Sequence, residues 1–144
     1  MTPTTKQLTK LSNRIESLRK RDVKLDDKAM CKLMRSAIRR MWSKHPVRLL
    51  VLDLNTVADM NPDTRTIWKV RCDCCGELYK KSDVEVDHIV GEHSLLSMSD
   101  VVDYANGVLN ITSDDLQVLC LGCHRVKTYA ERYGVEFDEA VIIL

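Results

Sequence analysis

Four of the chain's six cysteines stand in two Cys-x-x-Cys pairs, one at residues 72–75 and the other at residues 120–123. Four thiolates are the number that a closed tetrahedral zinc site requires, and each pair supplies two neighbouring ligands. A site of this kind fixes where two segments distant in the sequence meet, so it constrains the fold strongly. We therefore expect a structural zinc ion, bound by Cys72, Cys75, Cys120 and Cys123.

The first cysteine segment, "RCDCCG", contains a third cysteine, so Cys72 and Cys74 could also form a pair. We favour Cys72 with Cys75, because this gap matches the second pair and because Gly76 permits the tight turn of a metal knuckle. Buried free thiols are the competing interpretation. A thiol redox protein is disfavoured, since no βαβ pattern surrounds either pair.

A chain of 144 residues has the length of one compact domain with an appendage. No apolar run reaches the roughly 20 residues that span a bilayer, and the first ten residues lack the apolar stretch of a secretory signal. We therefore expect an intracellular protein without a membrane segment, in a compartment that keeps thiols reduced.

The net charge of +1 hides an uneven distribution of charge along the chain. Residues 1–50 carry 14 Lys and Arg against 4 Asp and Glu, whereas residues 51–144 carry 8 against 17. A basic half suits a polyanion such as nucleic acid, and an acidic half that also contains histidines suits cations. Ordinary solvated surfaces would give the same counts, and that alternative stays open.

Two amphipathic helices are predicted in the basic half. The first spans residues 5–21 and carries a narrow apolar stripe made by Leu8, Leu11, Ile15 and Leu18, which we expect to pack against another part of the protein. The second spans residues 28–44, is capped by Asp26 or Asp27, and stops before Pro46. We expect Cys31 in its core-facing side. Its outer face could lie along phosphates and carries Lys28, Lys32, Arg35, Arg39 and Lys44.

The remaining segments alternate between short helices, strands and loops. Residues 47–54 favour a helix, and β-branched content predicts strands at residues 66–72 and 83–90. Residues 58–66 and 91–112 are predicted loops, the second with a short helix near residues 99–105. A last helix is expected from Cys120 to about Tyr133, closed by Gly134.

The predicted strand at residues 83–90 contains Asp87-His88 near its end, and His124 directly follows the second cysteine pair. If the zinc clamp folds this strand onto the last helix, Asp87 and His124 can share a hard divalent cation. His88 is then free to take a proton from water as a general base. The other histidines are weaker candidates: His45 is expected to interact with the carbonyls of a helix end, and His93 to be a solvated loop residue. Trp42 and Trp68 are expected in the core.

Three segments, "CDCCG", "VEVDHIV" and "DLQVLCLGCHRVKT", together resemble the four-cysteine HNH endonucleases, a group common in bacteriophages. The resemblance covers residues 66–130, and the upstream "SAIRRMWSKHP" is similar to a basic helix that precedes this core in small phage enzymes. It implies an α+β protein with a ββα-metal core in residues 66–144, preceded by a basic helical region in residues 1–65. The implied activity is hydrolysis of double-stranded DNA with Mg²⁺ or Mn²⁺.

The resemblance also implies a role for each matching residue. His88 stands at the family's general base, Asp87 and His124 at its ligands to the divalent cation, and Lys127 at a phosphate-binding cation that Arg125 could assist. Apart from the resemblance, we expect the basic face of the helix at residues 28–44 to bind the DNA backbone through Arg35 and Arg39.

The family's middle asparagine falls at Asp115, which loses the amide donors but can still accept hydrogen bonds or bind a cation. Asp115 is kept as a catalytic-site residue. A zinc-stabilised DNA-binding or partner-binding module with a decayed site is the alternative, and the joint presence of Asp87, His88 and His124 favours the enzyme.

Overall fold

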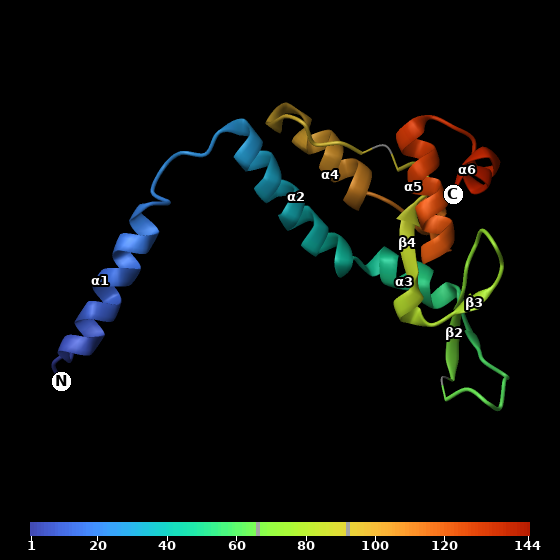
Figure 1. Cartoon of the computed structure of the whole chain (residues 1–144), viewed down its shortest axis with the longest axis horizontal. Coiled ribbons are helices and arrows are strands. Elements are labelled where there is room, and N and C mark those ends of the chain that lie inside the picture. Colours follow the sequence, from blue (N-terminus) through green and yellow to red (C-terminus); the bar gives the residue numbers. More distant parts are fainter. Residues whose placement is uncertain (66, 92) are drawn as a thin grey trace.

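The computed structural model describes residues 1–65, 67–91 and 93–144, and these form an α+β structure (Figure 1). The α-helices are α1 (Thr5–Arg19), α2 (Asp27–Ser43), α3 (Pro46–Leu54), α4 (Val101–Leu109), α5 (Leu121–Tyr133) and α6 (Phe137–Ile143). The strands are β1 (Thr56–Ala58), β2 (Trp68–Arg71), β3 (Leu78–Tyr79), β4 (Val84–His88) and β5 (Leu116–Cys120). None of the described helices combines the length and the apolar composition needed to cross a membrane.

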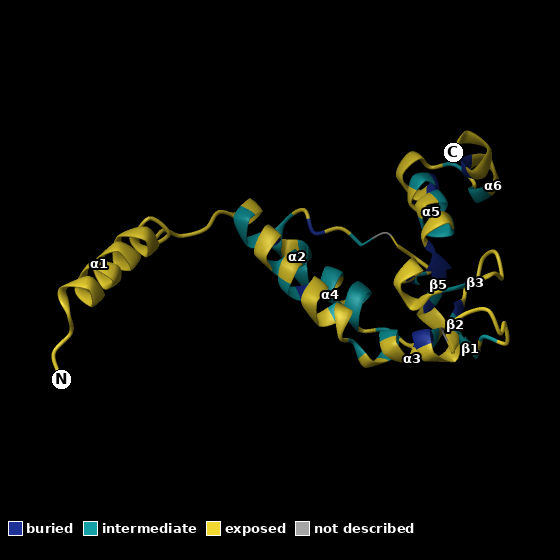
Figure 2. Cartoon of the chain, turned by 60° about the horizontal axis from the view of Figure 1, so that its bottom comes forward, coloured by how far each residue is buried: buried dark blue, intermediate teal, exposed yellow. Residues whose placement is uncertain are grey.

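Helix α1 stands apart from the rest of the chain, and its surface is exposed on all sides (Figures 1 and 2). Thr4 caps it by accepting from the Gln7 backbone amide at 3.2 Å, while the Gln7 side chain accepts from the Thr4 amide. The predicted helix is confirmed, but its apolar stripe is not covered: the four stripe residues are 44–57% exposed. The stripe was expected to pack against something, and no residue of α1 is buried.

Helices α2 and α3 agree with the predictions for residues 28–44 and 47–54. Asp26 caps α2 by accepting from the Ala29 amide at 2.8 Å, and Cys31 and Ile38 are its buried residues. Pro46 is the first residue of α3, where its missing amide proton costs nothing. Helix α4 packs along α2 (Figure 2), so α2 has one face towards α4 and an exposed basic face.

Two small antiparallel sheets share one apolar core. One sheet has the order β1-β2-β3, and the other pairs β4 with β5, with Asp87 opposite Gln117 and His88 opposite Leu116. Alternation along β4 sends the buried Val84 and Val86 inwards. The core cluster contains Val51, Leu52, Val70, Val84, Val86, Leu116 and Val118. Residues of α3 therefore pack in the same core as β4 and β5.

Most predicted elements agree with the structure, but Trp68, which was expected in the core, is 60% exposed on β2. The strands β2 and β4 and the helix α5, closed by Gly134 in a left-handed conformation, lie where they were expected. The short helix predicted near residues 99–105 exists as α4 and extends further. Strands β1, β3 and β5 and helix α6 were not predicted. The predicted loop at residues 58–66 and strand at 66–72 both include residue 66, which lies outside the described residues.

Candidate functional site

The four cysteines of the two Cys-x-x-Cys pairs converge where the β2–β3 turn meets the start of α5. The sulfur atoms of Cys72, Cys75, Cys120 and Cys123 all lie within 4.8 Å of one another. Zinc–sulfur bonds of about 2.3 Å in a tetrahedron separate the sulfurs by about 3.8 Å, so the cluster could hold a metal ion such as zinc. Cys74 is exposed and lies outside the cluster, in agreement with the choice of Cys75.

Backbone geometry builds both halves of this cluster. Gly76 has φ of 76°, a left-handed conformation that favours glycine, and its amide donates to the Cys72 carbonyl at 3.0 Å. Cys120 is the N-cap of α5, and its sulfur accepts from the Cys123 amide at 3.3 Å. The Cys120 amide in turn donates to the Cys72 sulfur at 3.3 Å. Amide donors therefore point at two of the sulfurs.

Hydrogen bonds also prepare two thiols for ionisation. Burial opposes ionisation of Cys120, but bonds from the Cys123 amide and the Tyr79 hydroxyl outweigh it and bring the pKa of Cys120 down to about 7. The Tyr79 hydroxyl, 3.4 Å from the Cys75 sulfur, lowers the pKa of Cys75. Burial and the neighbouring thiols raise the pKa of Cys123. Thiolates are the form that binds metal, so Cys75 and Cys120 are the better prepared ligands.

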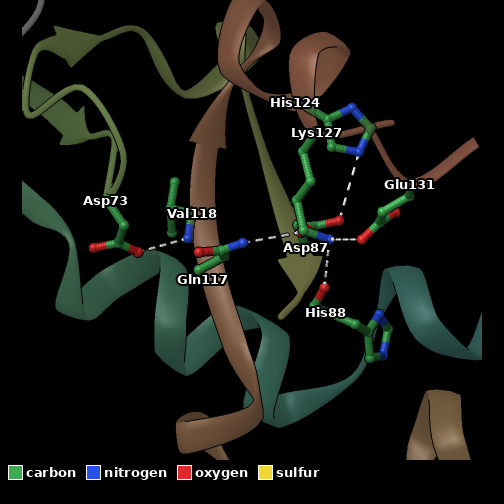
Figure 3. A network of polar contacts seen from close by, with 8 residues as sticks. All are labelled: Asp73, Asp87, His88, Gln117, Val118, His124, Lys127 and Glu131. Atoms are coloured by element: carbon green, nitrogen blue, oxygen red, sulfur yellow. Dashed lines mark hydrogen bonds and ion pairs between the residues drawn. The ribbon is translucent and has the colours of Figure 1, made fainter. Parts of the chain in front are cut away.

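Asp73, inside the first cysteine pair, joins the metal knuckle to β5 (Figure 3). Its carboxylate accepts from the Val118 amide at 2.7 Å, and its own amide donates to the Val118 carbonyl at 2.8 Å. No motif in the sequence pointed to Asp73. The contact fixes the distance between the cysteine cluster and the β4–β5 pair, on which the next group of residues lies.

Asp87 projects from β4 towards α5 and meets two helix residues there (Figure 3). Its Oδ1 lies 3.6 Å from His124 Nε2, and its Oδ2 lies 2.8 Å from Lys127 Nζ. Gln117, its cross-strand partner, donates to Oδ2 at 3.2 Å. Asp87 and His124 are therefore brought together as the sequence suggested, because the Cys120–Cys123 turn starts α5 directly after β5.

Lys127 lies at the centre of this network rather than free in solvent. Its ammonium group contacts Asp87 Oδ2, the His88 carbonyl at 3.0 Å and Glu131 Oε1 at 2.6 Å. Burial works to lower the pKa of Lys127, but its hydrogen bonds to Asp87 and Glu131 outweigh this and raise the pKa. The lysine is therefore a cation whose three N–H donors each have an oxygen partner.

The His88 side chain lies on the other side of β4, towards α2 and α4. Successive strand residues project to opposite faces, so Asp87 and His88 point apart. The His88 Nε2 atom lies 2.9 Å from the Val108 carbonyl, and the Trp42 ring lies 4.4 Å from the His88 ring between centroids. The structure brings Asp87 to His124 but does not bring the His88 ring to either of them.

A cleft of about 340 Å³ opens beside His88, and Asp115 is part of its lining. The Asp115 carboxylate accepts from the Thr112 amide at 2.8 Å, and the Asp115 carbonyl accepts from the Ile89 amide at 2.9 Å. Asp115 therefore holds the loop before β5 and ties it to the residue after His88. The Asp115 side chain accepts the hydrogen bond from the Thr112 amide, and an asparagine side chain could accept it equally well.

His93 also faces this cleft, with its ring 5.6 Å from the His88 ring between centroids. It rests on α4 at Gly107, where a Cβ atom would overlap the His93 ring. A glycine inside a helix costs stability, and here its lack of a side chain makes room for His93. His93 is half-buried in this position, so it is not the solvated loop histidine that the sequence favoured.

The predicted DNA-binding arginines differ in their surroundings. Arg125 and Arg39 are exposed, on α5 and α2. Arg35 is half-buried, and its guanidinium donates to the Leu95 carbonyl at 2.6 Å. Arg35 therefore has a structural contact to the segment before α4, and no pattern in the sequence predicts this contact.

Two residues that contact Asp87 or Lys127, Gln117 and Glu131, were not predicted from the sequence. The sequence pattern that could have indicated them differs between the two. Glu131 lies four residues after Lys127 on the same helix, a spacing at which opposite charges pair. Gln117 could be connected with Asp87 only through the register of β4 and β5. That register was not predicted, because β5 itself was not.

In comparisons with known proteins, no family model matched this chain, and no curated protein or solved structure was significantly similar to it.

Proposed function

We propose that this protein is a divalent-metal-dependent DNA endonuclease of the kind that its resemblance to the four-cysteine HNH enzymes implies. The observation that carries the proposal is the 3.6 Å separation between Asp87 Oδ1 and His124 Nε2. Around it, β4, β5 and α5 follow one another in space as two antiparallel strands and a helix, the order of a ββα-metal unit.

The donor set at Asp87 and His124 fits a divalent cation. A separation of 3.6 Å is too long for a hydrogen bond. Two ligands at about 2.1 Å from one cation lie about 3.0 to 3.4 Å apart, close to the separation seen. A carboxylate oxygen and an imidazole nitrogen suit Mn²⁺ and, with water ligands, Mg²⁺. When bound, the cation would neutralise charge on the phosphate and on its leaving oxygen.

His88 is the residue that we assign as general base. A carbonyl oxygen can only accept, so the contact with Val108 requires the proton on His88 Nε2 and leaves the lone pair on Nδ1. The Trp42 ring packs on His88 and limits its rotation. Because the His88 ring and Asp87 project from opposite faces of β4, this role requires the phosphate to bridge the end of the strand, where His88 is the last residue. Nδ1 would then take a proton from water as the water oxygen bonds to phosphorus and the bond to the 3′-oxygen breaks, leaving a 5′-phosphate.

The basic region would supply affinity for the DNA backbone. Residues 1–50 carry the excess of Lys and Arg, and the exposed face of α2 presents Arg39 on the outside of the fold. Contacts to phosphates hold a protein on DNA without reading sequence. Arg125, exposed beside His124 on α5, is the corresponding candidate close to the cation site. Arg35 is kept as a weaker candidate, since its guanidinium already binds Leu95.

One observation favours the alternative, a zinc-stabilised DNA-binding module without activity. Lys127 already neutralises Asp87, and Gln117 donates to the same oxygen. A carboxylate satisfied in this way does not need a metal ion. The module would keep the cysteine cluster and the basic region while having no use for His88.

The test is incubation of purified, zinc-loaded protein with supercoiled plasmid in Mg²⁺ or Mn²⁺, with and without EDTA. The enzyme should convert the plasmid to a nicked or linear form only when the divalent ion is present. Binding without conversion in either ion, seen as a shift of intact plasmid, would support the module and refute the nuclease.

A further inference from the structure

The two oxygens of Asp87 have different surroundings. Oδ2 accepts from Gln117 at 3.2 Å and pairs with Lys127 at 2.8 Å. Oδ1 faces His124 at 3.6 Å and has no other polar contact among the described residues. Both restraints on the carboxylate thus act on the oxygen that points away from His124. The rotation of the carboxylate is thereby fixed so that the free oxygen lies towards the imidazole.

Gln117 restrains Asp87 without changing the charge of the site. It is the direct cross-strand partner of Asp87, so its amide reaches the carboxylate from the neighbouring strand on the same face of the sheet. A neutral donor stabilises the carboxylate orientation but does not compete with a cation for it. Hydrogen bonds of this type to a metal-binding carboxylate usually strengthen metal binding.

Lys127 restrains the same oxygen but brings a positive charge to it. The lysine is held by two further oxygens, from Glu131 and from the His88 carbonyl, so it cannot easily swing away. Its side chain is only 16% exposed, which limits the screening of its charge by solvent. A divalent cation on Oδ1 would lie close to this ammonium group and would be repelled by it.

We propose that Gln117 and Lys127 control metal binding at Asp87 in opposite directions: Gln117 positions the carboxylate for the cation, and Lys127 is a built-in counter-ion that weakens its binding. The inference rests on the proposed cation site at Asp87 and His124. It gives Lys127 a different role from the phosphate contact that the family resemblance implied, because all of its donors are already used.

The experiment is a titration of zinc-loaded, DNA-free protein with Mn²⁺, followed by the electron paramagnetic resonance signal of the free ion. Gln117→Leu should weaken Mn²⁺ binding by about 10- to 100-fold, the usual effect of removing such a partner. Lys127→Met should strengthen it by about 30-fold, the effect of a unit charge about 4 Å from a divalent cation even in bulk water. His124→Ala should weaken binding in each background, which assigns the site.

Lys81→Met is the matched control, because it removes the same charge from a residue that is exposed and has no ion pair in the described part of the chain. Lys127→Gln provides a second neutral variant if Lys127→Met folds poorly, which zinc content and circular dichroism would show. Unchanged affinity in the Gln117 variant, or unchanged or weaker affinity in both Lys127 variants, would overturn this inference alone. Absence of Mn²⁺ binding in the wild type and in every variant would refute the cation site as well.

Discussion

Replacement of Cys120 by serine tests the cysteine cluster at one of its two buried cysteines. Cys120 is 5% exposed, and its sulfur lies within 4.8 Å of three other sulfurs. Structural zinc supplies about 10 to 16 kcal/mol of apparent binding free energy that becomes folding free energy. Whole domains are stable by only about 5 to 15 kcal/mol. A variant that cannot bind zinc should therefore lose the ordered junction between β5 and α5 entirely.

The assay combines zinc content by mass spectrometry with thermal unfolding followed by circular dichroism. Cys120→Ser should contain little zinc and show no cooperative transition, and a strong chelator should do the same to the wild type. Cys74→Ser is the matched control: Cys74 is exposed outside the cluster, so its free energy of unfolding should change by less than about 0.5 kcal/mol. A zinc-free Cys120→Ser protein that unfolds like the wild type would refute the reasoning.

Three further predictions follow from the fold. Deleting residues 1–25 removes α1, which has no buried residue, so the thermal stability should not change. The slope of log K for DNA binding against log salt concentration, measured by fluorescence anisotropy, should flatten by about 0.9 per lost phosphate contact. An unchanged slope would mean that α1 does not contact DNA. Gly107→Ala should lower the midpoint of urea unfolding, because displacement of His93 outweighs the roughly 1 kcal/mol that alanine gains in a helix. A higher midpoint would contradict the contact between His93 and Gly107. Asp115→Asn should preserve the free energy of unfolding, since the amide oxygen can still accept from the Thr112 amide. Asp115→Leu should lower the free energy of unfolding in urea by about 1 kcal/mol. An equal loss in both variants would argue against the acceptor role.

Local patterns explain what could be predicted from the sequence. The helices α1 and α2 follow from apolar spacing and from the cap at Asp26, and α5 ends at the glycine that permits a left-handed residue. The cysteine cluster follows from spacing and chemistry alone. The approach of Asp87 to His124 could be predicted from the cysteine cluster, because the cluster fixes where α5 begins.

Strand β5 was missed because its residues are almost all apolar, so no alternation separates it from the start of the helix that follows. The site contacts that depend on its register were missed with it. Gln117 meets Asp87 only through strand pairing, and Lys127 acquires its partners only when α5 lies across β4. The divergence of Asp87 and His88 could have been predicted from strand alternation.

The central claim is that His88 is the general base of a DNA hydrolysis that depends on a cation bound by Asp87 and His124. The most direct measurement compares plasmid cleavage by the wild type and by His88→Ala at saturating Mn²⁺, with zinc content and DNA affinity measured on the same preparations. Loss of a general base should slow cleavage by about 10²- to 10⁴-fold while both other quantities stay the same. A His88→Ala protein that cleaves plasmid as fast as the wild type would contradict the claim.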